Sequence, residues 1–330
     1  MQTHYKLYFI RTLTDLHAGT GRSDFSAIDH KVQRDWRGYP TIFKSSLKGA
    51  LREYLTQQQD DQSALVTHAL GGNRSLSSLI QKRLEAMKEE SQIKEKDKKV
   101  LDQLIQRFQE EVETQTQRGH YSLHDAELLS IPVRSNAQPY FNCTCPRILL
   151  DLKERLDFFD IDETIRNPLI GEIDELLTTA TNENVANNLL IFNQPHQMEN
   201  IYLEEYAHKV EDFDKDPKSF PILDRLLRSP FVVTKNEVFS SLVSDSYLPI
   251  IPRNQLDNRQ SKQLWYEQVL PTETRFYNFV GVPSASDSFL AKFDSAIHQK
   301  VINIGANLSV GYGRCYFENF STITSHETPA

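Results

Sequence analysis

Three observations predict a mixed α+β fold for this chain of 330 residues. With 39% hydrophobic and 25% charged residues, the chain can bury one large core or two modest ones, which excludes a disordered or fibrous protein. Segments with the two-residue period of strands are mixed along the chain with segments that have the helical period. No internal repeat and no low-complexity segment interrupts this order.

The first predicted element is a core strand from Tyr5 to Leu13, where aromatic or aliphatic residues alternate with polar ones. A loop from Leu16 to Pro40 follows, without a sustained helical or strand period. Loops of this length inside compact domains are usually functional or disordered. Because this loop combines many charges with His17, His30 and Trp36, we favour a functional loop.

A helix is predicted from Phe43 to Leu55, because apolar residues recur there at helical spacing and Ser45 or Ser46 is placed to cap its start. Gly49 weakens this helix by about 1 kcal/mol relative to alanine. The glycine therefore indicates a position where another part of the protein or a ligand approaches the helix closely.

Charge is unevenly distributed. The net charge of the chain is −8, which by itself argues against a nucleic-acid binder. Residues 1–52, however, hold nine basic and four acidic residues, a net charge of +5 that leaves −13 for the remainder. Lys44, Lys48 and Arg52 fall four residues apart on one face of the predicted helix. This ridge is either a solvated face or, with the first-turn N–H groups, a site for a phosphate.

Further helices and strands continue to the C-terminus. Residues 63–118 are predicted to form an inserted helical subdomain, since charged residues and apolar helical stripes dominate their later part. The other predicted strands are Ala126–Val133, Ile201–Tyr206, Leu264–Glu267, Thr274–Val280 and Arg314–Phe320, and the other predicted helices are Pro146–Phe159, Ile222–Leu227 and Phe289–Val301.

Residues 231–263 do not have the pattern of an ordinary core segment. Apolar residues flank Pro249 and Pro252, and a polar run follows them. A projecting hairpin that packs on another subunit or wedges between bases has this composition, and so does a plain surface loop.

No apolar run approaches the roughly 20 residues of a membrane span, and the first residues lack the layout of a signal peptide. We therefore expect a cytoplasmic protein with no membrane partner. Cys143, Cys145 and Cys315 cannot form a disulfide framework, and no second pair of ligands accompanies them at metal-site spacing. Free thiols are the expectation.

Seven motifs together resemble one family. They are HAGTG at 17–21, IDHKVQRD at 28–35, SSLKGALR at 45–52, DAELLSIPVRS at 125–135, YLEEY at 202–206, LWYEQVLP at 264–271 and GANLSVGYG at 305–313. In order and spacing they are similar to the RAMP superfamily of CRISPR effector proteins, above all to the repeated backbone subunit of type III-B (Cmr) complexes. The resemblance covers nearly the whole chain.

The resemblance implies a single RAMP domain over residues 1–330, with a ferredoxin-like (RRM-like) core. It also implies a helical insertion at 63–118 and a protruding thumb hairpin within 231–263. Copies of such a subunit stack in a helical filament along a guide crRNA, with other Cmr subunits as partners. The thumb flips out nucleotides at regular intervals, and target RNA is cut there.

Three residues are implied in cleavage. Asp29 occupies the position that family members require for cutting, where it would hold a divalent metal ion (Mg²⁺ or Mn²⁺) or help to move a proton. The target's 2′-OH would attack the neighbouring phosphate, giving a 2′,3′-cyclic phosphate and a 5′-OH. His17 is either an acid or base or a structural hydrogen-bonding residue. Glu267 either supports the cleavage site of a neighbouring copy or ends a strand.

Guide binding is expected from the basic and glycine-bearing motifs. The residues expected to contact RNA are Arg34, Ser45, Ser46, Lys48, Arg52, Gly305, Gly311 and Gly313. The chain departs from the family pattern at Ala306, Leu308 and Gln268. The last change puts in doubt any metal site that uses a carboxylate at position 268.

Other functions remain open from the sequence. The subunit could bind guide RNA as a non-catalytic scaffold, or it could be the equivalent subunit of a type III-A complex. A stand-alone guide-processing RNase of the same superfamily is a third reading, but such enzymes usually have two fused RAMP-like folds.

Overall fold

The structure is a computed structural model that describes residues 3–21, 27–58, 63–72, 118–159, 161–181, 188–192, 200–210, 220–228, 230–257 and 260–323. Most of the expected helical insertion, residues 73–117, lies outside these ranges. None of the described helices is both long and apolar enough to cross a membrane. The fold is mixed α+β, as predicted.

The centre of the molecule is an antiparallel sheet that joins the two ends of the chain. Strand β1 (His4–Thr12) lies between β12 (Arg275–Val282) and β14 (Arg314–Asn319), and β12 continues to β4 (Ala126–Arg134). Strand β13 (Lys300–Asn303) forms the edge beside β14. The structure thus confirms, to within one or two residues, the predicted strands Tyr5–Leu13, Ala126–Val133, Thr274–Val280 and Arg314–Phe320.

The sheet extends beyond β4 through strands of the middle of the chain. Its order there is β4-β5-β9-β6-β8-β7, and two-residue strands β2 (Thr41–Ile42) and β3 (Ser122–Leu123) pair with β4 and β12. The strands of this extension are β5 (Tyr140–Thr144), β9 (Phe231–Val233), β6 (Asn188–Phe192), β8 (Tyr206–Val210) and β7 (Asn200–Leu203).

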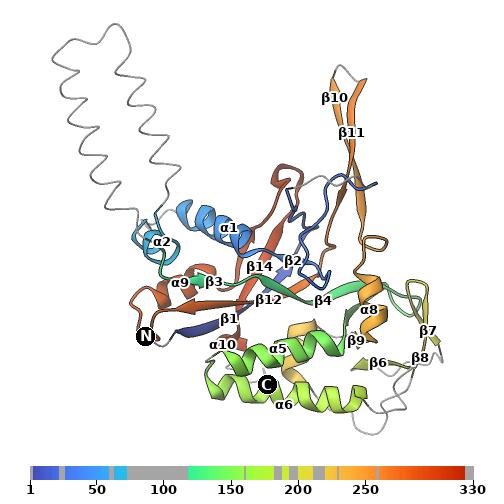
Figure 1. Cartoon of the computed structure of the whole chain (residues 1–330), viewed down its shortest axis with the longest axis horizontal. Helices are drawn as coiled ribbons and strands as arrows, with labels where there is room; N and C mark the ends of the chain where they lie inside the picture. Colours follow the sequence, from blue (N-terminus) through green and yellow to red (C-terminus); the bar gives the residue numbers. More distant parts are fainter. Residues whose placement is uncertain are drawn as a thin grey trace, which may run out of the picture.

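Helices cover both faces of the sheet (Figure 1). Alternation along β1 shows the two layers: Tyr8 packs edge-on against Phe293, and the next residue, Phe9, packs against Phe320 on the other face. The helices are α1 (Lys44–Thr56), α2 (Ser63–Leu70), α5 (Pro146–Phe158), α6 (Glu163–Thr181), α7 (Pro221–Leu223) with the π-helix η2 (Asp224–Arg228), α8 (Asn236–Leu242), α9 (Leu290–Ile297), the 3₁₀ turn η3 (Leu308–Val310) and α10 (Phe320–Ile323).

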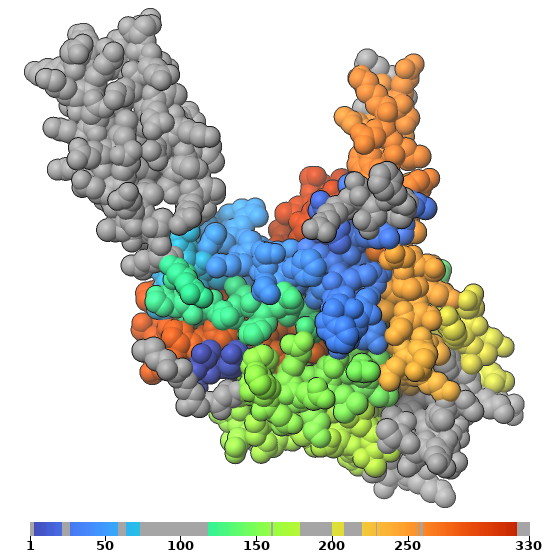
Figure 2. Space-filling model, viewed as in Figure 1, coloured from blue at the N-terminus to red at the C-terminus, as the bar shows by residue number. Residues whose placement is uncertain are grey.

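A two-stranded hairpin projects from this body. Among the described strands, β10 (Ile250–Asp257) and β11 (Gln260–Gln268) pair with each other and with no third strand, and the orange hairpin stands away from the sheet in Figures 1 and 2. The predicted start of this region at residue 231 is wrong. The apolar run 231–233 forms β9, a strand inside the main sheet, where Val232 is fully buried. Phe239 of the following helix α8 is fully buried as well.

Three other local predictions need correction. The segment Ile201–Tyr206 is a hairpin turn rather than one strand, with Glu204 in the left-handed region at φ 51°. The helix predicted to reach Val301 ends at Ile297, and the chain returns as β13. Neither Ser45 nor Ser46 caps α1; both lie inside its first turn, after the cap residue Phe43.

Candidate functional site

Asp29 is fixed to the base of the projecting hairpin. The backbone N–H groups of Asp29 and His30 both donate to the carbonyl oxygen of Tyr266, each at 3.1 Å. In return the Tyr266 N–H donates to Asp29 Oδ2 at 2.7 Å. Asp29 is half-exposed, and its Oδ1 has no recorded partner among the described residues. One carboxylate oxygen therefore holds the hairpin and the other is available.

His17 is tied to the same strand. Its Nδ1 lies 2.7 Å from the carbonyl oxygen of Gln268, which only accepts, so Nδ1 carries the proton and Nε2 of the neutral ring presents a lone pair. The backbone groups of Tyr266 and Gln268 point toward the same edge of β11, about 7 Å apart along the strand. The structure thus brings His17 and Asp29 to one side of the hairpin base.

A pocket of about 330 Å³ opens beside His17. A methyl group on Gly19 would lie 2.8 Å from His17 Nε2, so glycine at this position leaves that nitrogen accessible. The pocket is lined by His17, Ala18, Gly19, Thr20, Gly21, His30, Gln33, Ser46, Gly305 and Ala306.

Glu267, between these two anchor points, accepts three hydrogen bonds from side chains of the protein. Its carboxylate accepts from Trp265 Nε1 at 2.8 Å, from Arg253 Nε at 3.1 Å and from Asn307 Nδ2 at 2.7 Å. Burial works to raise the pKa of Glu267, but the hydrogen bonds from Trp265 and Arg253, together with the nearby His17 and the charge of Arg253, hold that pKa below its ordinary value. Glu267 is a charged clamp between the hairpin and the glycine stretch.

Gln268 connects the Asp29 loop to the turn that follows α8. Its side-chain Oε1 accepts from the Val32 N–H at 3.3 Å, and its Nε2 donates to Asp245 at 3.1 Å. Asp245 also pairs with Lys31 at 3.0 Å and Arg34 at 2.9 Å. An amide fits here because it can accept from one neighbour and donate to another, which a carboxylate cannot do.

The donor set around Asp29 limits how a metal could be held. Among the described residues, no three His, Cys, Asp or Glu side chains gather closely enough to bind a metal ion. Asp29 offers one open oxygen, and position 268 is an amide. Mg²⁺ commonly binds through one or two carboxylates together with substrate phosphates. The residues fit an ion shared with RNA and do not fit a resident metal.

The N-terminus of α1 begins between two pockets. Side chains from outside the helix take its outermost N–H groups: Gln33 Oε1 accepts from Phe43, and Asp125 Oδ1 accepts from Lys44, both at 2.7 Å. No acceptor is recorded within the described ranges for the N–H groups of Ser45 and Ser46, and first-turn N–H groups have no partner inside a helix. This end of the helix can therefore receive an anion.

A basic pocket of about 630 Å³ lies on the other side of Ser45. Lys48 enters it half-buried, and burial together with the nearby Arg52 and Arg118 lowers the pKa of Lys48. In Figure 2 this region is the boundary between the blue surface of α1 and the green strip that follows residue 118. The lining residues are Lys44, Ser45, Lys48, Arg118, Gly119, His120, Tyr121, Ser122 and Leu123.

Two arginines expected to bind RNA are engaged inside the protein. Arg34 donates to the carbonyl oxygens of Gly38 and Val243 as well as to Asp245. Arg52 donates to the carbonyl oxygens of Leu70 and Gly71, at the end of α2. These contacts give the expected phosphate-binding roles of Arg34 and Arg52 no support.

The three glycines of the 305–313 stretch serve different purposes. A methyl group on Gly305 would lie 2.4 Å from the His17 carbonyl oxygen, and one on Gly313 would lie 2.1 Å from that of Ile304. Gly311 has φ 90° and nothing within 4 Å of such a group. Gly305 and Gly313 are thus required by close internal packing, and only Gly311 leaves open space for a ligand.

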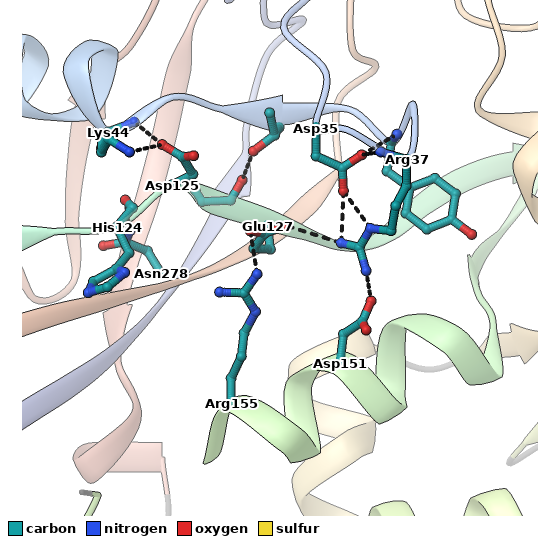
Figure 3. A network of polar contacts seen from close by, with 12 residues as sticks. Asp35, Arg37, Lys44, His124, Asp125, Glu127, Asp151, Arg155 and Asn278 are labelled. Atoms are coloured by element: carbon teal, nitrogen blue, oxygen red, sulfur yellow. Dashed lines mark hydrogen bonds and ion pairs between the residues drawn. The ribbon is translucent and has the colours of Figure 1, made fainter. Parts of the chain in front are cut away.

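An ion-pair network missed by sequence reasoning holds the end of the functional loop (Figure 3). Arg37 pairs with Asp35 at 2.8 Å, with Glu127 at 3.3 Å and with Asp151. Arg155 reaches the other oxygen of Glu127 at 2.7 Å. The network joins the loop to β4 and α5. No sequence signal identifies such partners, because they lie up to 114 positions apart in the chain.

Comparisons with known proteins agree with the motifs. The family model described as the RAMP superfamily matches residues 9–316. A curated relative, the CRISPR system Cmr endoribonuclease Cmr4 of Pyrococcus furiosus, is 26% identical over 321 residues, which cover 92% of this chain and 91% of the relative.

Two solved structures have the same fold. One is the cryo-EM structure of the type III-B Cmr-beta bound to cognate target RNA. A chain of that structure is 20% identical to this chain with a TM-score of 0.70, and the match covers 97% of this chain and 98% of the other. The other is the crystal structure of oligomeric Cmr4 from Pyrococcus furiosus, with a TM-score of 0.59, 20% identity and the same coverage.

Proposed function

The chain belongs to the RAMP superfamily, and on that premise we propose that it is the repeated backbone subunit of a type III-B Cmr complex. In this role it binds guide crRNA, assembles with further copies of itself and with other Cmr subunits, and cleaves complementary target RNA at regular intervals. The relative named an endoribonuclease supports the activity, and the neighbours described as oligomeric and as bound to target RNA support the partners. The expected cytoplasmic location belongs to the same proposal.

The core of this subunit is ferredoxin-like. Supporting this, the elements β1–α1–β4–β12–α9–β14 follow each other in the chain, with spatial strand order β14-β1-β12-β4 and antiparallel neighbours throughout. The hairpin β10–β11 is then the thumb, inserted between β4 and β12 in the chain.

The observation that carries the proposed activity is the connection of Asp29 to the thumb. Tyr266 fixes Asp29 Oδ2 by a backbone N–H, so Oδ1 keeps a defined position at the thumb base. His17 is fixed through the same strand. A target nucleotide displaced by a thumb would lose its stacking, which frees its 2′-OH to align with the adjacent phosphate.

The reaction needs two proton movements. The target 2′-oxygen forms a bond to phosphorus as the bond to the 5′-oxygen breaks, which gives a 2′,3′-cyclic phosphate and a 5′-OH. The proton of the 2′-OH must leave and the 5′-oxygen must gain one. Asp29 Oδ1 is positioned to accept a proton or a hydrogen bond from the 2′-OH, and His17 Nε2 can exchange a proton on the pocket side.

A divalent ion, when bound between Asp29 and the RNA phosphates, would neutralise negative charge on the reacting phosphate. Asp29 is the residue of this chain that would contact it. Lys48, Ser45 and Ser46 would hold guide phosphates at the start of α1, where the basic pocket and open N–H groups lie.

The test is cleavage of end-labelled target RNA by the complex assembled with guide RNA, with and without EDTA. A regularly spaced, EDTA-sensitive ladder that depends on the guide and ends in 2′,3′-cyclic phosphates is expected. Target bound without any ladder would instead identify a non-catalytic scaffold. Cutting of precursor guide RNA by the chain alone would identify a processing enzyme.

A further inference from the structure

Three flat rings form a column beside the basic pocket. His68 of α2 stacks on His120, with ring centroids 4.6 Å apart and planes 26° apart. On its other side His68 stacks on Phe289, at 4.5 Å and 25°. Three segments of the chain thus supply one ring each, and of these three rings only His120 borders the basic pocket described above.

The column is held rigidly. His68 Nε2 lies 2.8 Å from Asp287 Oδ2, and the backbone N–H of His120 donates to the His68 carbonyl oxygen at 2.9 Å. The hydroxyl of Tyr121 donates to the second oxygen of Asp287 at 3.2 Å. These bonds fix the middle ring and the backbone of the outer one, so the column is assembled before any ligand arrives.

The outer ring of the column, that of His120, borders the basic pocket. His120 is exposed and lines the 630 Å³ pocket together with Lys44, Lys48 and Arg118. Among the described residues His68 is the one ring stacked on His120, which is otherwise exposed at the pocket wall. An exposed flat ring and several cations thus border one cavity.

This combination matches a nucleotide of single-stranded RNA. Bases stack on aromatic rings without sequence preference, while lysine and arginine neutralise the phosphates that follow. The crowding of Lys48 by Arg118 also favours an anion between them.

We propose that His120 is a stacking platform for one unpaired base of the bound RNA, with the adjoining phosphates on Lys48 and Arg118. The inference rests on the proposed guide binding at α1 and extends it from phosphate contacts to a base contact. His68 and Phe289 act as positioning residues, because they support the outer ring without touching RNA.

Equilibrium binding of single-stranded RNA by the full chain, over a series of salt concentrations, separates the two kinds of contact. Stacking energies of about 1–3 kcal/mol per base correspond to a 5- to 150-fold loss of affinity for His120→Ala. Since no phosphate contact is removed, the salt slope should not change. His120→Phe should bind as the natural chain does.

Two further variants calibrate the measurement. Lys48→Ala should lower affinity and reduce the salt slope by about one. Phe158→Ala removes an exposed ring on α5, which does not line the pocket, and this variant should bind normally. With 5-iodouridine in the RNA, photocrosslinks should map to residues 118–123 and disappear in His120→Ala.

Failure is distinguishable at two levels. If His120→Ala binds as tightly as the natural chain, or if its salt slope falls as in Lys48→Ala, the stacking platform is refuted and guide binding stands. If the natural chain binds no RNA at any salt concentration, the proposed function fails together with this inference.

Discussion

Replacing Glu267 by glutamine distinguishes a structural role of this residue, as a clamp, from a catalytic role. In the natural chain the Glu267 carboxylate receives three hydrogen bonds, one at Oε1 and two at Oε2. Glutamine has a single acceptor oxygen. If that oxygen stays with Arg253 and Asn307, the new NH₂ group faces the N–H of Trp265, and two donors oppose each other.

The magnitude follows from these contacts. A hydrogen bond to a charged group contributes about 1.5–3 kcal/mol, and the two bonds that remain fall to neutral strength. We therefore expect the free energy of unfolding to decrease by about 2–4 kcal/mol. For a chain of this size about 2 °C accompanies each kcal/mol, so the midpoint of thermal unfolding should fall by about 4–8 °C.

Two assays on the same preparation decide the role of Glu267. Thermal unfolding of Glu267→Gln should show the expected drop, and target cleavage by its complex should slow only about tenfold, because the thumb strand that positions Asp29 loosens. Glu154→Gln, an exposed change on α5, is the matched control. An unchanged midpoint combined with a thousandfold loss of cleavage would refute the clamp and make Glu267 a catalytic residue.

Three other changes have defined outcomes. The folded-state pKa of Glu267 lies below the ordinary glutamate value. The Glu267 carboxylate therefore stabilises the fold at pH values above the ordinary pKa, and this stabilisation is lost as pH falls through the folded-state pKa. A titration of the free energy of unfolding toward acid pH should show the loss in the natural chain and not in Glu267→Gln. Gln268→Glu sets a carboxylate about 3.1 Å from Asp245, and its slowed cleavage should recover at lower pH or with Asp245→Asn, as pH–rate profiles would show. Gly305→Ala should destabilise the chain by several kcal/mol in denaturant titrations, because the new methyl group would lie 2.4 Å from a carbonyl oxygen. Gly49→Ala should instead stabilise α1 by about 1 kcal/mol, because no atom lies within 4 Å of the new methyl group.

Regular elements with a clear period could be predicted from the sequence. Helix α5 buries Ile148, Leu149, Leu152 and Leu156, the residues its pattern predicts. By contrast, helix α6 was missed, since Pro168 inside it is typical of a helix end. The sequence assigns the apolar run 231–233 to the projecting region, because a short strand carries no period that separates it from a loop.

The site was predictable only in part, for a physical reason. The motifs place Asp29 and His17, but the bonds that fix them come from Tyr266 and Gln268, more than 230 residues away in the chain. The charge of Arg34 likewise says nothing about the carbonyl groups that surround it. Long-range hydrogen bonds of this kind depend on the completed fold.

The most direct test of the central claim is the rate of target cleavage by complexes that carry Asp29→Asn or Asp29→Ala, with target binding measured on the same complexes. Asparagine keeps an acceptor for the Tyr266 N–H, so the loop should stay in place while the available carboxylate oxygen is lost. We predict that both variants bind target as the natural complex does and cut it at least a hundredfold more slowly, whereas Asp157→Ala, an exposed change on α5, cuts normally. A regularly spaced ladder at the natural rate from the Asp29 variants would contradict the account.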